Sequence, residues 1–268
     1  MRTLQETPRV TVVVPARMAS SRFPGKPLVP IFGLPMVEHV RRRAALAEGV
    51  DDVVVATCDQ EILEAVHRAG GRAVMTADTH ERCTDRVEEA MRALAGDIVV
   101  MVQGDEPLLV PDAVRQVAAP LLADPAVVCT NLLSPLESDE DLVNPNIVKA
   151  VCGRAGRVMF FTRAAVPSYR VRVECPVYRQ TGIMAFRADL LRTYSSLPET
   201  PFERAESVDM LRLLEHGFAI HGVVVSYPTI GVDRPGDVPL VEAWVREHPD
   251  QQSWLAQTLA MSPSGEQS

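Results

Sequence analysis

The sequence predicts an α/β fold: a single three-layer domain in which helices cover both faces of a mostly parallel, mixed and twisted sheet. Apolar segments of strand length alternate with segments of helical periodicity through the first half of the chain, which is typical of parallel strands with crossover helices. The first apolar segment, residues 10–14, has no polar alternation, and this indicates a strand buried on both faces. The chain has 268 residues, 47% of them hydrophobic, which is enough for one large domain with a sizeable core.

The first half of the chain gives five expected strands and four expected helices. The strands are expected at residues 10–14, 53–56, 72–75, 98–102 and 126–132. The helices are expected at residues 36–47, 61–69 and 86–94, and a fourth begins at Pro111. Thr84 is the expected N-cap of the third helix, because a threonine hydroxyl can accept a backbone N–H at a helix start.

After residue 144 the pattern changes to one with antiparallel pairing. Residues 147–151 and 158–162 flank a turn that contains Gly153 and Gly156, which predicts a β-hairpin. Further strands are expected at residues 178–186 and 219–226, and further helices at residues 190–196, 208–215 and 237–247. Residues 1–260 are thus expected to form the domain, and residues 261–268 are expected to be a disordered tail.

Charge and cysteine content narrow the classes of function. The formal net charge is −8, which argues against general nucleic-acid binding. The five cysteines form no CxxC pair, and this predicts reduced thiols rather than a disulfide framework or a zinc site. No apolar stretch has the length of a membrane span, and no signal-peptide core is seen. We therefore expect a cytoplasmic protein that binds neither nucleic acid nor membrane.

Residues 15–27 form a basic loop directly after the first strand. Three prolines and one glycine prevent a regular element here, and side-chain donors are concentrated in the loop: Arg17, Ser20, Ser21, Arg22 and Lys26. Anionic ligands often bind at the carboxyl ends of strands in such sheets, so this loop is a candidate phosphate site. Lys26 is one of only two lysines among 27 basic residues, which favours a compact ammonium beside phosphate. The alternative is a solvated surface loop whose positive charge has no ligand.

The loop also carries a family resemblance. Pro15-Ala16-Arg17, followed by SSRFPGKP at residues 20–27, resembles the opening signature of the sugar-activating cytidylyltransferases, most closely the 3-deoxy-manno-octulosonate (KDO) family. Members of that family transfer CMP from CTP to an acid acceptor. The resemblance continues through VQGDEP at residues 102–107, NPN at residues 144–146, Lys149 and GVD at residues 231–233. It implies a nucleotide-diphospho-sugar transferase-like fold, an antiparallel sub-lobe for acceptor binding and dimerisation, and a homodimer.

Two aspartates are candidate Mg²⁺ ligands. Asp105 follows the expected strand at residues 98–102, and Asp233 follows a second apolar segment. Nucleotidyl transfer uses Mg²⁺ to neutralise triphosphate charge, and Mg²⁺ prefers one or two carboxylates together with phosphate and water oxygens. The resemblance assigns the same two positions as metal ligands. The alternative is that each aspartate only caps a helix or a turn.

The expected nucleotide site combines phosphate-binding and base-reading residues. Arg17, Arg22 and Lys26 are expected to hold the phosphates and, with Asp105, to carry catalysis, because phosphoryl transfer depends on positioning and electrostatics. Gln103 and Gly104 present side-chain and backbone groups beside them. The resemblance implies that the cytosine is read by Ala16, His80, Thr84, Asp85 and Arg86. Cys58 and Cys83 stand where the family has other residues and are expected to be small semi-apolar groups facing the interior.

The expected acceptor site departs most from the family pattern. Its members, by resemblance, are Gln103, Arg163, Arg179, Gln180, Thr181, Glu203, Glu206 and Asp209. Gln180-Thr181 replaces a histidine and an aliphatic residue, and Met184 replaces an aromatic one, while both arginines keep the capacity to bind an anion. This pattern favours a small acid, phosphonoformate being the leading candidate, with CMP-phosphonoformate and pyrophosphate as products. KDO or an amino-substituted ulosonic acid is the alternative acceptor. The alternative from another class is a non-catalytic homologue that binds CTP.

Overall fold

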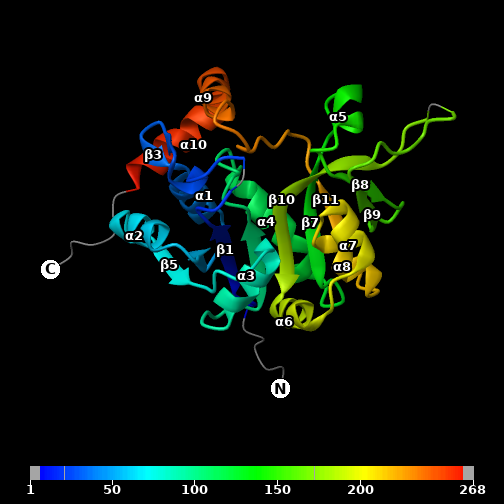
Figure 1. Ribbon diagram of the computed structural model, residues 1–268, viewed down its shortest axis with the longest axis horizontal. Helices are drawn as coiled ribbons and strands as arrows, with labels where there is room; N and C mark the ends of the chain where they lie inside the picture. The colour runs from blue at the N-terminus through cyan, green and yellow to red at the C-terminus, as the bar shows by residue number, and fades with distance from the viewer. Residues whose placement is uncertain (1–6, 21, 172, 262–268) are drawn as a thin grey trace.

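A nine-stranded mixed sheet forms the centre of the computed structural model, which describes residues 7–20, 22–171 and 173–261 (Figure 1). Seven strands follow one path across the sheet, in the order β11-β7-β10-β6-β1-β4-β5, and β8 and β9 extend it beside β10. Their bounds are β1 Val10–Ala16, β4 Asp52–Thr57, β5 Arg72–Met75, β6 Ile98–Val102, β7 Cys129–Ser134, β8 Lys149–Cys152, β9 Val158–Thr162, β10 Val177–Arg187 and β11 His221–Val224. A separate two-stranded sheet joins β2 (Pro30–Ile31) to β3 (Leu34–Pro35).

Strand direction makes the sheet mostly parallel. β1 pairs in parallel with β4 and β6, β4 with β5, and β11 with β7. β10 lies antiparallel between β6 and β7, so along the seven-strand path described here it alone is reversed. The predicted α/β fold with a mixed, mostly parallel sheet is confirmed.

Helices cover both faces of this sheet. In chain order they are α1 Met36–Ala45, α2 Gln60–Arg68, α3 Cys83–Met91, α4 Pro111–Ala123, α5 Asp139–Val143, α6 Ala188–Ser196, α7 Pro201–Glu206, α8 Met210–Glu215, α9 Asp237–Glu247 and α10 Pro249–Ala260. Val12 and Val14 of β1 pack with α1, α2 and α4 on one face, whereas Val13 packs on the other face with α3, α6 and α8. This alternation along one buried strand gives the three layers.

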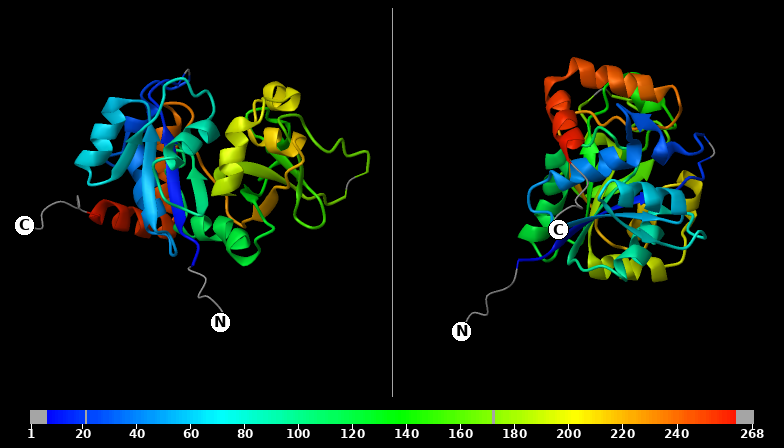
Figure 2. Two further views of the ribbon diagram at one scale, coloured as in Figure 1. Left: turned by 90° about the horizontal axis from the view of Figure 1, so that it is seen from below. Right: turned by 90° about the vertical axis from the view of Figure 1, so that its left-hand side faces the viewer.

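Helices α9 and α10 lie together at one end of the molecule (Figure 2). They pack on a third apolar cluster that includes Ile31, Met36, Leu108 and Val232. Because Leu108 and Val232 belong to the loops that carry Asp105 and Asp233, this cluster supports both loops from behind. None of the helices in the described part of the chain has the length and hydropathy that crossing a membrane requires.

The predicted hairpin is confirmed as β8 and β9, which pair antiparallel and form a sub-lobe with the first residues of β10 (Figure 1). β10 is 11 residues long, and its two halves serve different parts of the fold. Val177–Arg179 pair with β8, and residues 183–187 pair with β6. One strand therefore connects the sub-lobe rigidly to the central sheet.

Several sequence-based boundaries were wrong. Helix α3 begins at Cys83 with Arg82 as its N-cap, so Thr84 lies inside the first turn, where its hydroxyl donates to Asp209 Oδ2 at 2.6 Å instead of capping the helix. Helices α5 and α7 have five and six residues, too few to show a helical period. Helix α10 follows α9 after a single residue and begins at Pro249, in the first helical turn where proline is tolerated. Of the predicted tail only Met261 is described; residues 262–268 lie outside the described residues.

Candidate active site

Two neighbouring hollows open at the edge of the sheet where β1 and β6 end. The nucleotide-side hollow has a volume of about 730 Å³ and is lined by the basic loop, Cys83 and residues 103–105. The acceptor-side hollow has a volume of about 510 Å³ and is lined by β10, residues 144–148 and the loop at residues 229–233. Arg22, Gln103 and Asp105 line both hollows. The two spaces therefore meet at residues that the sequence predicted to be functional.

Strand direction explains this convergence. β1 and β6 are parallel, so the basic loop after Ala16 and the loop after Val102 leave the same edge of the sheet. β10 runs the other way and pairs Ile183 with Val102, so Gln180, Thr181 and Gly182 lie beyond the end of β6 on that edge. The main chains join here as well, because Gln103 N–H donates to Gly182 O at 2.9 Å.

The Lys26 ammonium is the centre of the site. Its Nζ donates to Asp105 Oδ2 at 2.7 Å and to Val232 O at 2.8 Å, and it lies 3.9 Å from Asp233 Oδ1. The Lys26 side chain is 13% exposed, compared with 29% for Asp105 and 48% for Asp233. Arg22 reaches the same group, with Nη2 3.0 Å from Asp233 Oδ1. The structure thus brings the two predicted metal ligands and two predicted phosphate ligands into one charged cluster.

Backbone contacts hold this cluster in place. Gly25 has a φ of 75°, a left-handed conformation that suits glycine, and its N–H donates to Met18 O at 3.0 Å, which closes the basic loop. Val232 N–H donates to Asp105 O at 2.9 Å, so the two aspartate loops are joined next to their carboxylates. Asp233 N–H donates to Asp237 at the start of α9. These contacts fix the turn before Lys26 and the two loops that carry Asp105 and Asp233.

The donor set of the two aspartates fits a divalent cation of the Mg²⁺ type. Their carboxylates are close enough for one ammonium to contact both. Among the described residues, no group of three or more His, Cys, Asp or Glu side chains is arranged to hold a metal. A pair of carboxylates with no further protein ligand suits an ion that completes its shell with phosphate and water oxygens.

The remaining nucleotide-side residues have more varied positions. Ala16, Arg17, Ser20, Gln103 and Gly104 all line the nucleotide-side hollow. Arg17 Nη1 donates to His80 O at 3.4 Å, which connects the basic loop to the segment before α3. Gly104 is needed for close packing, because a Cβ there would lie 2.9 Å from Pro15 O. Ser21, also predicted to bind nucleotide, lies outside the described residues.

The predicted base-reading run at residues 84–86 does not line either hollow. Thr84 is fully buried against Asp209, and Arg86 is buried and donates to Thr76 Oγ1 and Ala77 O. Cys83 faces the nucleotide-side hollow instead. Burial, with a further contribution from the Asp209 charge, raises the pKa of the Cys83 thiol to about 12, so it is a neutral, weakly polar wall residue. The sequence predicted a small semi-apolar residue facing the interior; the weakly polar character agrees, but Cys83 lines the hollow.

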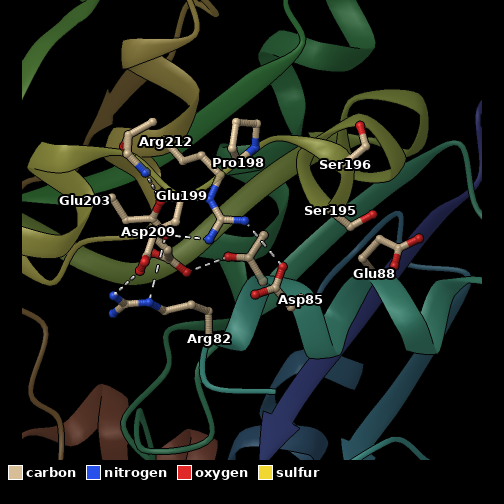
Figure 3. Close-up of polar contacts among 12 residues, drawn as sticks. Arg82, Asp85, Glu88, Ser195, Ser196, Pro198, Glu199, Glu203, Asp209 and Arg212 are labelled. Carbon is tan, nitrogen blue, oxygen red and sulfur yellow. Dashed lines mark hydrogen bonds and ion pairs between the residues drawn. The ribbon is translucent and has the colours of Figure 1, made fainter. Parts of the chain in front are cut away.

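Glu203 and Asp85 belong to a charged cluster behind the site (Figure 3). Glu203 is fully buried and accepts two hydrogen bonds from Arg212, at 2.8 and 2.7 Å. Arg212 also lies 3.7 Å from Asp85 Oδ1 and stacks over the Tyr194 ring, 4.4 Å from its centroid. Burial raises the pKa of Asp85 despite this arginine. Glu203 lines neither hollow, and its geometry is that of a buried ion pair holding α7 to α8.

The acceptor-side hollow receives its predicted residues mainly from β10. Arg179, Gln180 and Thr181 line it together with Arg163 and Asp209. Gln180 Nε2 donates to Asn131 Oδ1 at 2.9 Å, and Thr181 Oγ1 donates to Leu132 O at 2.7 Å. The register of β10 against β7 shifts between Gln180 and Met184, and this irregularity turns the residues toward the hollow.

The two predicted anion-binding arginines are already engaged with protein groups. Arg179 Nη1 donates to Thr229 O at 3.2 Å, and its Nη2 lies 3.5 Å from Asp141 Oδ2. Arg163 Nε donates to Glu206 O at 2.7 Å, and its Nη1 donates to Pro145 O at 3.0 Å. Glu206 itself does not line the hollow; its carboxylate accepts from Thr162 and from Arg163 N–H.

Sequence reasoning missed two charged residues that line the acceptor-side hollow, Glu106 and Asp141. Glu106 accepts from Gly182 N–H at 3.3 Å, and burial, with the neighbouring Asp105 charge, raises its pKa to about 7. Its place beside Asp105 in the run at residues 102–107 was a usable signal. Asp141 lies on the short helix α5, for which the sequence gave no periodic signal.

Comparison with known proteins identifies the family. Residues 11–220 match the family model described as Cytidylyltransferase. The chain is 41% identical over 244 residues to the 3-deoxy-manno-octulosonate cytidylyltransferase of Geobacter metallireducens, covering 87% of this chain and 96% of that protein. It is 40% identical to the protein of the same description from Acaryochloris marina, covering 89% and 98%.

Solved structures give the same result. That of CMP:2-keto-3-deoxy-manno-octonic acid synthetase complexed with CTP matches with a TM-score of 0.85 at 38% identity, covering 89% of this chain and 99% of that one. A cytidylyltransferase from Leptospira borgpetersenii, 15% identical with a TM-score of 0.61, shares the fold. From its sequence, its structure and these relatives, the chain belongs to the KDO cytidylyltransferase family and is a CTP-dependent nucleotidyltransferase.

Proposed function

We propose that this enzyme makes CMP-KDO: an acceptor oxygen of KDO attacks the α-phosphorus of CTP, a new P–O bond forms, and pyrophosphate leaves. The observation that carries the proposal is the charged cluster of Lys26, Arg22, Asp105 and Asp233 at the junction of the two hollows. A nucleotide on one side and an acid on the other would meet there.

Each part of the cluster has a role in this reaction. Arg22 and Lys26 bind the phosphates and stabilise charge that develops on the phosphoryl oxygens. Asp105 and Asp233 would hold Mg²⁺, which supplies charge neutralisation to the triphosphate when bound. Gln103 lines both hollows and orients the acceptor against the nucleotide. Arg17, Ser20 and the main chain at Gly104 bind the remaining nucleotide groups.

The sequence pattern favoured phosphonoformate, whereas the comparisons favour the alternative acceptor, KDO. The structure supplies a physical reason to prefer KDO. The small-acid interpretation assumed two free cations, but Arg179 lies beside Asp141 and Arg163 donates to main-chain carbonyls. A hollow of about 510 Å³ lined by Asn144, Asn146, Ser207 and Asp209 also suits a polyhydroxylated acid.

A competition experiment tests this acceptor assignment. With equal concentrations of KDO and phosphonoformate, we expect CMP-KDO to be the dominant product, because the hydroxyl groups of KDO can pair with the polar wall. Mass spectrometry of the CMP adducts, with pyrophosphate release as a parallel readout, measures the ratio. Dominant CMP-phosphonoformate would restore the small-acid interpretation, and CTP binding without either product would favour a non-catalytic homologue.

The enzyme should also select cytidine over uridine. A base site built on hydrogen bonds leaves buried groups unpaired with the wrong base edge, so we expect kcat/KM for CTP to exceed that for UTP by about 100-fold or more. Cys83 forms part of the hollow wall. The Cys83→Gly variant should therefore still prefer CTP, but the ratio of kcat/KM for CTP to kcat/KM for UTP should differ from that of the unaltered enzyme. Equal kcat/KM values for the two nucleotides in the unaltered enzyme would contradict a cytidine-specific site.

The homodimer implied by the family resemblance stays a prediction, which analytical ultracentrifugation would test.

A further inference from the structure

Lys149, the first residue of β8, is a fully buried lysine that contacts three main-chain carbonyls. Its Nζ donates to Asn144 O at 2.9 Å, to Ile147 O at 2.9 Å and to Arg163 O at 2.7 Å. Burial, with the nearby Arg163 charge, lowers its pKa. An ammonium has three N–H donors, so these three carbonyls satisfy it completely and offset the cost of burying its charge.

The three carbonyls belong to residues in two segments that line the acceptor-side hollow. Asn144, Asn146 and Ile147 line the hollow from the segment before β8, and Arg163 lines it from the end of β9. Lys149 follows the first segment directly, and β-sheet pairing sets it beside Thr162 of β9, next to Arg163, and beside Arg179 of β10. The paired register of β8 and β9 begins at Lys149, so the ammonium extends the connection to Asn144 and Ile147, which lie before it.

The Arg163 side chain strengthens the same link from the other direction. Its Nη1 donates to Pro145 O at 3.0 Å and to Asn146 O at 3.4 Å, while Lys149 holds the Arg163 carbonyl. The backbone of the segment at residues 144–147 is otherwise held locally: Asn144 N–H donates to Glu140 O at 3.0 Å, Ile147 N–H to Asn144 O at 3.2 Å, and Asn146 N–H to Asn144 Oδ1 at 2.9 Å. None of these local contacts reaches Arg163, so the contacts of Lys149 and Arg163 are what set the segment against the end of β9.

We propose that Lys149 is a positioning residue of the acceptor site: it fixes the segment at residues 144–147 against Arg163, and thereby sets the distance between the polar groups that recognise the acid. It touches no substrate itself. The proposal rests on the proposed function in one respect, that the hollow lined by β10 binds the acceptor.

Residue chemistry explains why a lysine is needed here in a chain that otherwise uses arginine. The three acceptors surround one point, which suits a compact ammonium, whereas a planar guanidinium directs its donors outward in one plane. Arginine is also larger than lysine, and the Lys149 side chain is fully buried, so the extra volume has no room in solvent. The Lys149→Arg variant should therefore also have a raised KM for KDO, although it preserves the positive charge.

The test compares Lys149→Met, Lys149→Gln and Lys149→Arg with the control Val158→Ala, a core change on the neighbouring strand β9. KM for KDO, KM for CTP and kcat are measured for each variant, and stability is measured by urea unfolding. We expect Lys149→Met to raise KM for KDO by about 10-fold or more with little change in KM for CTP, because small displacements of positioning groups have large effects. Lys149→Gln, which can still donate to two carbonyls, should have an intermediate KM.

The control separates positioning from stability. Val158→Ala should lower the free energy of unfolding yet leave KM for KDO unchanged. The proposal is overturned if Lys149→Met or Lys149→Gln folds and keeps the normal KM for KDO. It is likewise overturned if Val158→Ala raises KM for KDO as much as an equally destabilised Lys149 variant does. It is also overturned if neither variant folds, since Lys149 would then be a folding residue. If the unaltered enzyme does not use KDO at all, the proposed acceptor fails, and the same comparison is made with the acid that it does use.

Discussion

Replacing Asp105 or Asp233 with alanine should lower kcat for CMP transfer by about 1,000-fold or more, since several kcal/mol of charge stabilisation at the triphosphate would be lost. Both carboxylates lie near the Lys26 ammonium. Among the described residues, no third acidic, histidine or cysteine side chain is arranged to replace either carboxylate as a metal ligand. Pyrophosphate release at saturating CTP and Mg²⁺ measures the loss. Mn²⁺ binding, followed by electron paramagnetic resonance, should weaken in parallel.

A matched control is Asp189→Ala on α6, whose side chain is 90% exposed and pairs with Arg192. It removes the same charge from the protein without approaching either hollow, so its kcat should be unchanged. Circular dichroism should show that all three variants keep the fold. Near-normal turnover in Asp105→Ala or Asp233→Ala would remove that residue from the metal site.

Lys26→Ala should lower kcat/KM for CTP by about 100- to 1,000-fold, the range seen when one preorganised donor to a transition state is removed. Lys26 is half-buried and contacts both aspartates, and in the proposed site it would also bind the nucleotide phosphates; Arg22 is too exposed to replace it. Lys26→Met, which keeps most of the aliphatic stem, should lose nearly as much. This comparison assigns the loss to the charge rather than to packing.

The effect of Lys26→Ala on unfolding should be small beside its effect on turnover. The Lys26→Arg variant keeps the positive charge. Compared with Lys26→Ala, it should regain part of the phosphate binding but not the contacts with Val232 O and both aspartates. Unchanged CTP turnover in Lys26→Ala would show that the basic loop is an ordinary solvated surface.

The position of the site could be predicted from the sequence because it depends on strand direction. Buried strands at residues 10–14 and 98–102 had to be parallel, so the basic loop and Asp105 had to leave one edge of the sheet. Asp233 joins them through the contact between Val232 N–H and Asp105 O, a long-range contact that local sequence pattern does not encode. Their positions after apolar segments suggested that the two aspartates act together, and the family resemblance indicated the same pair.

Side-chain directions were harder to predict. Thr84 and Arg86 occupy positions that match the family motif, yet the start of α3 at Cys83 turns them inward. Glu203 was predicted to be an acceptor-binding residue. Its carboxylate instead accepts hydrogen bonds from Arg212, nine residues later on the next helix. Such choices depend on which buried partner a side chain meets, and a single sequence does not specify that.

The contact between Lys26 and Asp105 has a thermodynamic consequence for the metal. Lys26 is a counterion to both carboxylates, and its charge offsets their mutual repulsion. At the proposed metal site, uptake of Mg²⁺ would then be an exchange of cations rather than a simple association, and its affinity would include the work of detaching the ammonium. A triphosphate gives that ammonium a new anion to bind, which lowers this work. Nucleotide and metal should therefore each tighten the binding of the other, by linkage through one side chain.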